Sequence, residues 1–154
     1  MATGNFKVLV IPGPTLYNRL FAPHVDARLR ELFDLTFNES DESWSSNELA
    51  EKIAPFDAIV TSWGSPEITS EVLDAATNLK LVAHSAGSVK GIVKPVVLER
   101  GILVSSAAYA LAPAVAEFSL LLTMLGLRPV RAGARIWTVI TSSTHSSWDT
   151  AGTT

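Results

Sequence analysis

The chain has 154 residues, of which 47% are hydrophobic and 18% are charged, and this composition suits one globular domain with a buried core. It contains no cysteine, which excludes disulfide frameworks, thiol nucleophiles and cysteine-based zinc sites. A formal net charge of −3 gives no general attraction to nucleic acids or anionic membranes, so we expect neither as a partner.

The N-terminus lacks the features of a secretory signal. Residues 1–5 contain no basic residue, and they lead directly into the apolar run of residues 8–11. A secretory signal has instead a positively charged segment before a longer apolar stretch. We therefore expect a cytoplasmic protein, and the absence of cysteine agrees with a reducing compartment.

Short apolar runs alternate with helical patterns along most of the chain. Five runs predict β-strands, at residues 7–11, 35–37, 57–60, 81–83 and 102–104. Helices are predicted between and after them, near residues 21–33, 47–53, 68–76, 95–100 and 113–125. This alternation predicts an α/β fold, in which a parallel sheet of about five strands carries helices on both faces.

Residues typical of helix ends support these positions. Asn47 is a candidate N-cap for the helix over residues 47–53. Gly101 follows residues 95–100 as the glycine that ends a helix. Pro113 is expected in the first turn of the last helix, where its missing N–H is not needed.

The last predicted helix belongs to a long apolar run, residues 110–127. Pro113 and Glu117 interrupt this run, whereas a membrane-spanning helix needs about 20 apolar residues with few or no charges. We therefore predict a buried helix of a soluble protein and no membrane partner. In the tail, ten of the seventeen residues from Thr138 to Thr154 are Ser or Thr, and we expect residues 131–154 to be disordered.

Parallel α/β sheets bind ligands beyond the carboxyl ends of their strands. The loops at that edge are residues 12–15, 61–65 and 84–90. His84 ends a predicted strand there and is a candidate contact for a ligand. Trp63 either packs into the core or lines the ligand pocket, and the sequence leaves both alternatives open.

Common catalytic and cofactor motifs are absent from the sequence. It has no G-x-G-x-x-G after a strand, no Walker A loop and no G-x-S-x-G elbow. His24 is expected on a helix surface and His145 in the tail, and neither has a metal-ligand neighbour at a useful spacing. The sequence therefore predicts no metal site and no catalytic residue.

Several segments together resemble one family. Residues 79–88 (LKLVAHSAGS), 99–104 (ERGILV) and 114–118 (AVAEF) have the order and spacing of the D-isomer-specific 2-hydroxyacid dehydrogenases. Residues 61–64 (TSWG) are similar to the loop after the third strand of that family. The resemblance covers roughly residues 6–130.

The resemblance implies a domain organisation. Residues 6–111 would form a flavodoxin-like substrate (catalytic) domain. Residues 112–130 would form the helix that leads to the coenzyme domain of the family and packs at the dimer interface. Residues 131–154 would be a disordered tail, with the coenzyme domain missing.

The resemblance also implies a substrate site, in which backbone N–H groups of the loop after the fourth strand hold the substrate carboxylate. By position these groups belong to Gly87 and Ser88, supported by His84–Ala86, with Trp63 in the neighbouring loop. Amides in a tight loop are preorganised donors for a carboxylate. Many members have glycine at Ser88, and serine restricts the backbone more than glycine does. They also have aspartate at Lys90, a lysine that either attracts an anionic substrate or is simply solvated.

Members of the family are considerably longer, and their nucleotide fingerprint and catalytic Arg, Glu and His lie beyond the end of this chain. We therefore interpret the chain as the truncated N-terminal part of an NAD(P)-dependent oxidoreductase that interconverts a small 2-hydroxy acid and its 2-oxoacid. We expect it to bind neither NAD nor NADP well and to be inactive alone. The alternative is a free-standing flavodoxin-like module that binds a small carboxylate or a protein without catalysis. In both cases the apolar helix has no coenzyme domain to lie against, which predicts homo-oligomers.

Overall fold

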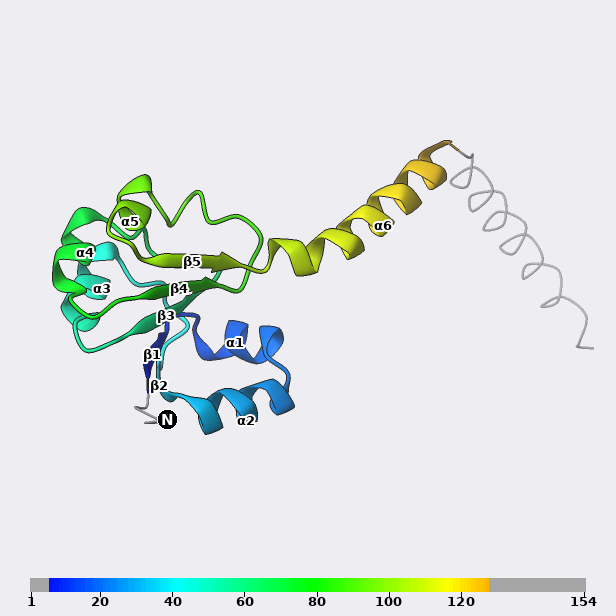
Figure 1. The fold of residues 1–154 in the computed structure, drawn as a ribbon. Helices are drawn as coiled ribbons and strands as arrows, with labels where there is room; N and C mark the ends of the chain where they lie inside the picture. Colours follow the sequence, from blue (N-terminus) through cyan, green and yellow to red (C-terminus); the bar gives the residue numbers. More distant parts are fainter. Residues whose placement is uncertain (1–5, 128–154) are drawn as a thin grey trace, which may run out of the picture. The chain divides into compact units, whose positions relative to one another are not determined.

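The computed structural model of the chain describes residues 6–127 (Figure 1). Contacts within the chain divide it into two units, residues 1–111 and 112–154. The tail predicted to be disordered, residues 131–154 with His145, lies outside the described residues.

Five parallel strands form one sheet in the order β2-β1-β3-β4-β5. They are β1 (Lys7–Val10), β2 (Asp34–Phe37), β3 (Ala58–Thr61), β4 (Leu81–His84) and β5 (Leu103–Ser106). Each lies within two residues of an apolar run that predicted a strand. The predicted α/β fold with a five-stranded parallel sheet is therefore confirmed.

Six helices accompany the sheet within residues 6–127. They are α1 (Pro14–Leu20), α2 (Pro23–Leu32), α3 (Ser46–Lys52), α4 (Ser70–Ala75), α5 (Pro95–Glu99) and α6 (Ala108–Leu127). The sequence did not predict α1, because seven residues are too few for a helical period to stand out. Pro14 and Pro23 begin α1 and α2, where the fixed φ of proline suits the first turn.

The start of α3 differs from the prediction. Its N-cap is Ser45, whose hydroxyl accepts a hydrogen bond from the amide of Glu48 at 3.3 Å. The Glu48 carboxylate in turn accepts one from the amide of Ser45 at 2.7 Å, which completes a capping box. The prediction of Asn47 as N-cap is wrong, because these reciprocal bonds fix the helix start two residues earlier. Gly101 has a φ of +75° directly after α5, in agreement with its predicted role at the helix end.

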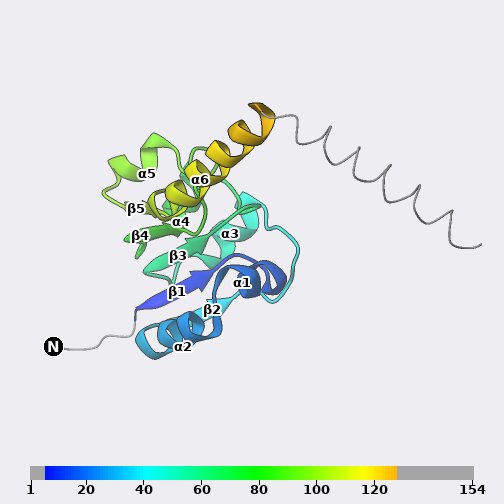
Figure 2. The same cartoon turned by 90° about the vertical axis from the view of Figure 1, so that its right-hand side faces the viewer.

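The helices divide between the two faces of the sheet (Figures 1 and 2). The chain moves from β1 to β2 in one direction and from β2 to β5 in the other, so right-handed connections place α1 and α2 opposite α3, α4 and α5. We call the face under α3, α4 and α5 the closed face. Its core contains the strand residues Leu9, Ile59 and Val82, the helix residues Leu49, Val72 and Val97, and Ile53, which follows α3.

We call the other side of the sheet, under α1 and α2, the open face. Its strand side chains alternate with those of the closed face and include Val60, Leu81 and Ala83. Beside α1 and α2 lies a groove of about 340 Å³ on these side chains. Leu103 of β5 is in register with Leu81 and is 69% exposed. Among residues 6–107, no helix covers the β4–β5 side of this face.

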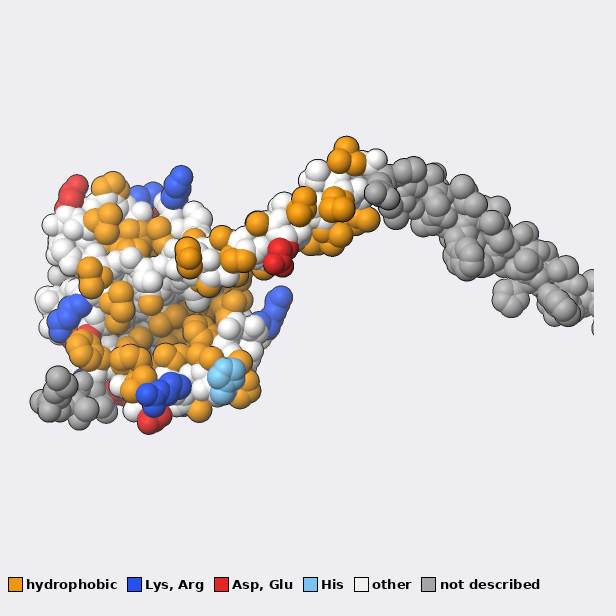
Figure 3. Space-filling view, turned by 45° about the vertical axis from the view of Figure 1, so that its right-hand side comes forward, with side chains coloured by type: hydrophobic (Ala, Val, Ile, Leu, Met, Phe, Trp, Pro, Cys, Tyr) orange, Lys and Arg blue, Asp and Glu red, His pale blue; other side chains and the backbone are white. Residues whose placement is uncertain are grey.

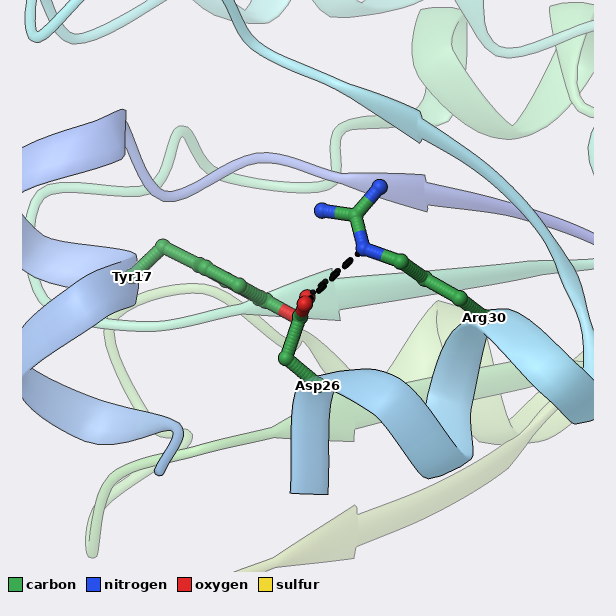
Figure 4. A network of polar contacts seen from close by, with 3 residues as sticks. All are labelled: Tyr17, Asp26 and Arg30. Carbon is green, nitrogen blue, oxygen red and sulfur yellow. Dashed lines mark hydrogen bonds and ion pairs between the residues drawn. The ribbon is translucent and has the colours of Figure 1, made fainter. Parts of the chain in front are cut away.

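A network of polar contacts joins α1 to α2 at the edge of the open face (Figure 4). The hydroxyl of Tyr17 donates a hydrogen bond to Asp26 at 2.8 Å, and Nε of Arg30 donates to the same carboxylate at 2.9 Å. The guanidinium of Arg30 also lies 4.5 Å from the ring centre of Phe37. Burial, reinforced by the bond to Asp26, raises the pKa of Tyr17 to about 12. The hydrogen bonds from Arg30 and Tyr17 hold the pKa of Asp26 below its usual value.

Helix α6 corrects one expectation. It begins at Ala108, so Pro113 lies inside the helix and not in its first turn. The helix is apolar along its length, as the sequence predicted. By length and composition α6 is the one helix among the described residues that could cross a membrane. Glu117 is the charged residue near its middle.

Candidate functional site

The carboxyl ends of β1, β3 and β4 lie along one edge of the sheet. Thr61 pairs with His84 in the register of β3 and β4, and Val10 pairs with Val60 in that of β1 and β3. Parallel strands end at the same edge, so the loops after these strands are neighbours. This edge is the ligand-binding edge of open α/β sheets, as the sequence predicted.

His84 is placed beneath this edge and not at its surface. Its side chain is on the closed-face side of β4 with that of Thr61, and the residue is only 5% exposed. Its Nδ1 lies 2.9 Å from the hydroxyl oxygen of Thr61. Burial lowers the pKa of His84, so the ring is neutral at pH 7. His84 is therefore placed to support the loop that follows it.

The start of the loop after β4 is anchored from two strands. The amide and the hydroxyl of Ser85 both donate to the carbonyl of Thr61, at 2.8 and 2.9 Å. The amide of Ala107, which follows β5, donates to the carbonyls of His84 and Ala86 at 3.0 and 3.1 Å. Thr61 and Ala107 were not singled out from the sequence, because these contacts join strands that are distant along the chain.

Gly87 and Ser88 follow this anchored segment. Neither amide donates a hydrogen bond to another residue of the described part of the chain. Among the described residues only Gly64 and Gly101 have a positive φ, so the serine at position 88 causes no backbone strain. A Cβ built at Gly87 meets no atom within 4 Å, so the space above this residue is open. Gly87 is partly exposed and Ser88 is exposed.

Trp63 lies in the turn after β3. This turn is fixed by Gly64, with a φ of +77°, and by a hydrogen bond from the amide of Ser62 to the hydroxyl of Ser65 at 2.9 Å. Trp63 is 60% exposed, so the alternative of core packing is wrong. It lines a cavity of about 180 Å³ with residues of the loops after β1 and β2, among them Asp41. Gly87, Ser88 and His84 are not among the residues that line that cavity.

The first turn of α1 does not fit a dinucleotide phosphate. The Asp41 carboxylate accepts hydrogen bonds from the amide and the hydroxyl of Thr15, at 2.9 and 2.6 Å. These bonds hold the pKa of Asp41 below its usual value, so it is ionised. A negative charge thus already lies where the helix N-terminus after β1 would bind a phosphate. Pro14 also has no N–H to donate to a phosphate. A Cβ at Gly13 would lie 2.6 Å from Asp41, so no space is left for a phosphate beside the backbone of Gly13.

The other histidine in the described part of the chain lies on a helix surface. His24 lies exposed on α2, as predicted. Across residues 6–127, no group of three or more His, Cys, Asp and Glu side chains is arranged to hold a metal ion.

Comparison with known families identifies the fold and the relationship. Residues 15–153 match the family described as D-isomer specific 2-hydroxyacid dehydrogenase, catalytic domain. The chain belongs to this family. The match extends beyond residue 130, so the expectation that the resemblance ends there is wrong.

Solved structures of similar fold include members of this 2-hydroxyacid dehydrogenase family. A protein from Pyrococcus horikoshii OT3 is 26% identical, with a TM-score of 0.69 over 97% of this chain and 42% of its own. The 2-hydroxyacid dehydrogenase from Ketogulonicigenium vulgare Y25 has the same fold at 18% identity, with a TM-score of 0.59 over 100% of this chain and 43% of its own. The chain thus spans less than half the length of these relatives. No curated protein matches it.

Proposed function

We propose that the loop after β4 binds the carboxylate of a small 2-oxoacid or 2-hydroxy acid through the main-chain N–H groups of Gly87 and Ser88. In this proposal the chain is the substrate-binding part of an NAD(P)-dependent oxidoreductase. The observation that carries it is that both amides lack a partner within the described residues, at the ligand edge of a dehydrogenase catalytic domain.

The surroundings of the two amides support this role. Hydrogen bonds anchor Ser85 to the end of β3 and Ala86 to Ala107 after β5. The amides of Gly87 and Ser88, which follow, are therefore preorganised, and binding a carboxylate to them orders no side chain. The open space at Gly87 lets a carboxylate approach the backbone closely. Because His84 beneath them is neutral at pH 7, the amides and the exposed Lys90 provide the attraction for an anion.

Binding is tested by titrating the full chain, labelled with ¹⁵N, with glyoxylate or pyruvate. We expect the amide signals of Gly87 and Ser88 to shift in a saturable manner. Pyruvamide, which lacks the carboxylate, is the control ligand and should leave these signals unchanged. Equal shifts with pyruvamide, or none with the acids, would overturn the proposed site.

Two variants separate the backbone from the side chain of Ser88. Ser88→Pro removes the N–H and should abolish carboxylate binding. Ser88→Ala keeps the N–H and should retain it. Loss of binding in Ser88→Ala with an unchanged fold would show that the hydroxyl, and not the backbone, is the donor.

The oxidoreductase half of the proposal concerns the reaction. The described residues do not fit a dinucleotide at α1. We therefore expect that the full chain alone neither binds NADH measurably nor oxidises NADH in the presence of a 2-oxoacid. Turnover by the purified chain would contradict this expectation.

A second candidate function is a free-standing module that binds a small carboxylate without catalysis. The contact between Asp41 and the first turn of α1 favours this second candidate, because the Asp41 carboxylate occupies a position where a coenzyme phosphate could otherwise bind. The DNA sequence downstream of codon 154 distinguishes the candidates. A frame that encodes a glycine-rich nucleotide fingerprint favours the oxidoreductase, and its absence favours the binding module.

A further inference from the structure

A cavity of about 300 Å³ lies where α1 and α2 meet the segments that follow β1 and β2. Proline and phenylalanine side chains form its apolar wall, and the charged side chains that line it are Asp26, Arg30 and Glu39. Every residue that lines it belongs to residues 1–111, and none belongs to the loop after β4. The cavity therefore shares no residue with the proposed carboxylate site and is complete without α6.

Arg30 is held in one orientation at this cavity. Its Nε donates a hydrogen bond to Asp26 at 2.9 Å, and its guanidinium lies 4.5 Å from the ring centre of Phe37. The buried Tyr17 fixes Asp26 in turn through its hydroxyl. The two terminal nitrogens of Arg30 point away from Asp26 (Figure 4), and neither donates a hydrogen bond to another residue of the described part of the chain. Arg30 thus presents a preorganised pair of donors, a geometry that binds a carboxylate through two parallel hydrogen bonds.

Glu39, which follows β2, supplies the opposite charge to the same cavity. Within residues 6–127 its carboxylate forms no ion pair. Glu39 and Arg30 therefore line one cavity without pairing with each other. The space between these two groups is open to a ligand that carries a negative charge for Arg30 and a positive charge for Glu39.

The balance of charge and the size of the cavity narrow the class of ligand. On the face of the domain shown in Figure 3, charged side chains are scattered among hydrophobic ones, so the surface as a whole does not attract one sign of charge. The cavity itself has two carboxylates and one guanidinium, and a simple anion therefore gains little attraction there. Its volume lies at the lower end of the range for small-molecule sites, about 300–1,000 Å³. A small zwitterion with an apolar part matches these features.

We propose that this cavity binds a free amino acid with an apolar side chain. The carboxylate of the amino acid accepts hydrogen bonds from the terminal nitrogens of Arg30, and its ammonium group donates to the carboxylate of Glu39. Its side chain packs against the apolar wall at Pro12 and Phe37. The side-chain amide of Asn18, which also lines the cavity, can donate to the carboxylate or accept from the ammonium group.

Ligands that lack one of the two charges test the proposal on the full chain labelled with ¹⁵N. With L-leucine, we expect the backbone amide signal of Glu39 and the Nε–H signal of Arg30 to shift in a saturable manner. The 2-oxoacid of leucine keeps the carboxylate without the ammonium group, and isoamylamine keeps the ammonium group without the carboxylate. Neither should saturate these two signals at the concentrations at which leucine does. Equal binding of either probe at this cavity, or no binding of leucine and phenylalanine, would overturn the proposal.

Matched variants test the two charged anchors. Arg30→Gln and Glu39→Gln each remove one charge and should weaken leucine binding by about tenfold or more. Arg28→Gln and Glu31→Gln are the controls, because these residues pair with each other at 2.7 Å on the exposed surface of α2 and do not line the cavity. Both controls should keep the affinity of the wild type. An equal loss in the controls would overturn the proposal, because it would reduce the binding to a general effect of surface charge.

The loop after β4 separates this proposal from that of the carboxylate site. Arg30→Gln should leave the shifts of Gly87 and Ser88 with pyruvate unchanged, since neither residue lines this cavity. Leucine that shifts Gly87 and Ser88 but neither Arg30 nor Glu39 would overturn the amino-acid site and leave the carboxylate site standing. Saturable binding of inorganic phosphate at Arg30, unaffected by Glu39→Gln, would assign the cavity to simple anions and would also overturn the proposal.

Discussion

The two faces of the sheet are built from the same five strands and differ in what covers them. On the closed face, short connections bring α3, α4 and α5 back over the strands, and Ile59 and Val82 are fully buried. On the open face, α1 and α2 cover one side, and Leu103 remains exposed. The comparison shows that the strand–helix connections complete the layer on the closed face, whereas among residues 6–107 they leave Leu103 of the open face exposed.

The strongest test of this difference is a pair of truncations on the two faces. Ile59→Ala removes a fully buried side chain from the closed face and should lower the free energy of unfolding by about 2–5 kcal/mol. Leu103→Ala on the open face should change it by less than about 0.5 kcal/mol, since the side chain is exposed. Urea unfolding of the monomer at low protein concentration measures both. A large effect of Leu103→Ala would show that the open face is covered within one chain.

The helices of the two faces also begin differently, and the caps give the next largest effect. Ser45 caps α3 with its side chain, whereas α1 and α2 begin with proline and have no side-chain cap. Ser45→Ala should cost about 0.5–2 kcal/mol of stability. Asn47→Ala, inside the first turn, is the matched control and should cost less. If both variants unfold at the same urea concentration, the capping box does not stabilise the domain in solution.

A smaller effect is expected from the network beside the open face. Tyr17→Phe removes the hydroxyl that bonds to Asp26 and should cost about 0.5–1.5 kcal/mol. In the wild-type chain the pKa of Tyr17 is raised to about 12 from an ordinary 10.0, so the unfolded chain loses this proton first. The free energy of unfolding should therefore fall between pH 10 and 12, and this contribution should be absent in Tyr17→Phe. Tyr109→Phe, at a 93% exposed site, should retain it.

The last effect, which vanishes at neutral pH, concerns His84 on the closed-face side of β4. Burial holds its pKa below the ordinary 6.5, so below that pH the unfolded chain binds a proton that the folded chain does not. Stability is therefore complete above pH 6.5 and falls as the pH is lowered, by at most about 1.4 kcal/mol per pH unit. Urea unfolding between pH 7 and 5 should show a shallower slope for His84→Gln than for the wild type. His24→Gln, at an exposed site, should keep the wild-type slope, and an unchanged slope in both would contradict a buried neutral His84.

The sequence by itself determined the strands, because their apolar runs and the Gly and Pro residues that bound them are local signals. The run over residues 81–83 and the glycine at 101 are examples. The sequence also determined the family, since the order of the segments after β3 is carried along the chain and needs no tertiary contact.

Only the tertiary structure decided where the predicted site residues stand. It buried His84 against Thr61, placed Trp63 in the wall of a cavity with residues of the loops after β1 and β2, and directed Asp41 to the first turn of α1. The contacts of His84 and Asp41 join residues that are 23 and 26 positions apart. Contacts of this kind leave no periodic signal in the chain, because they depend on what the fold brings together.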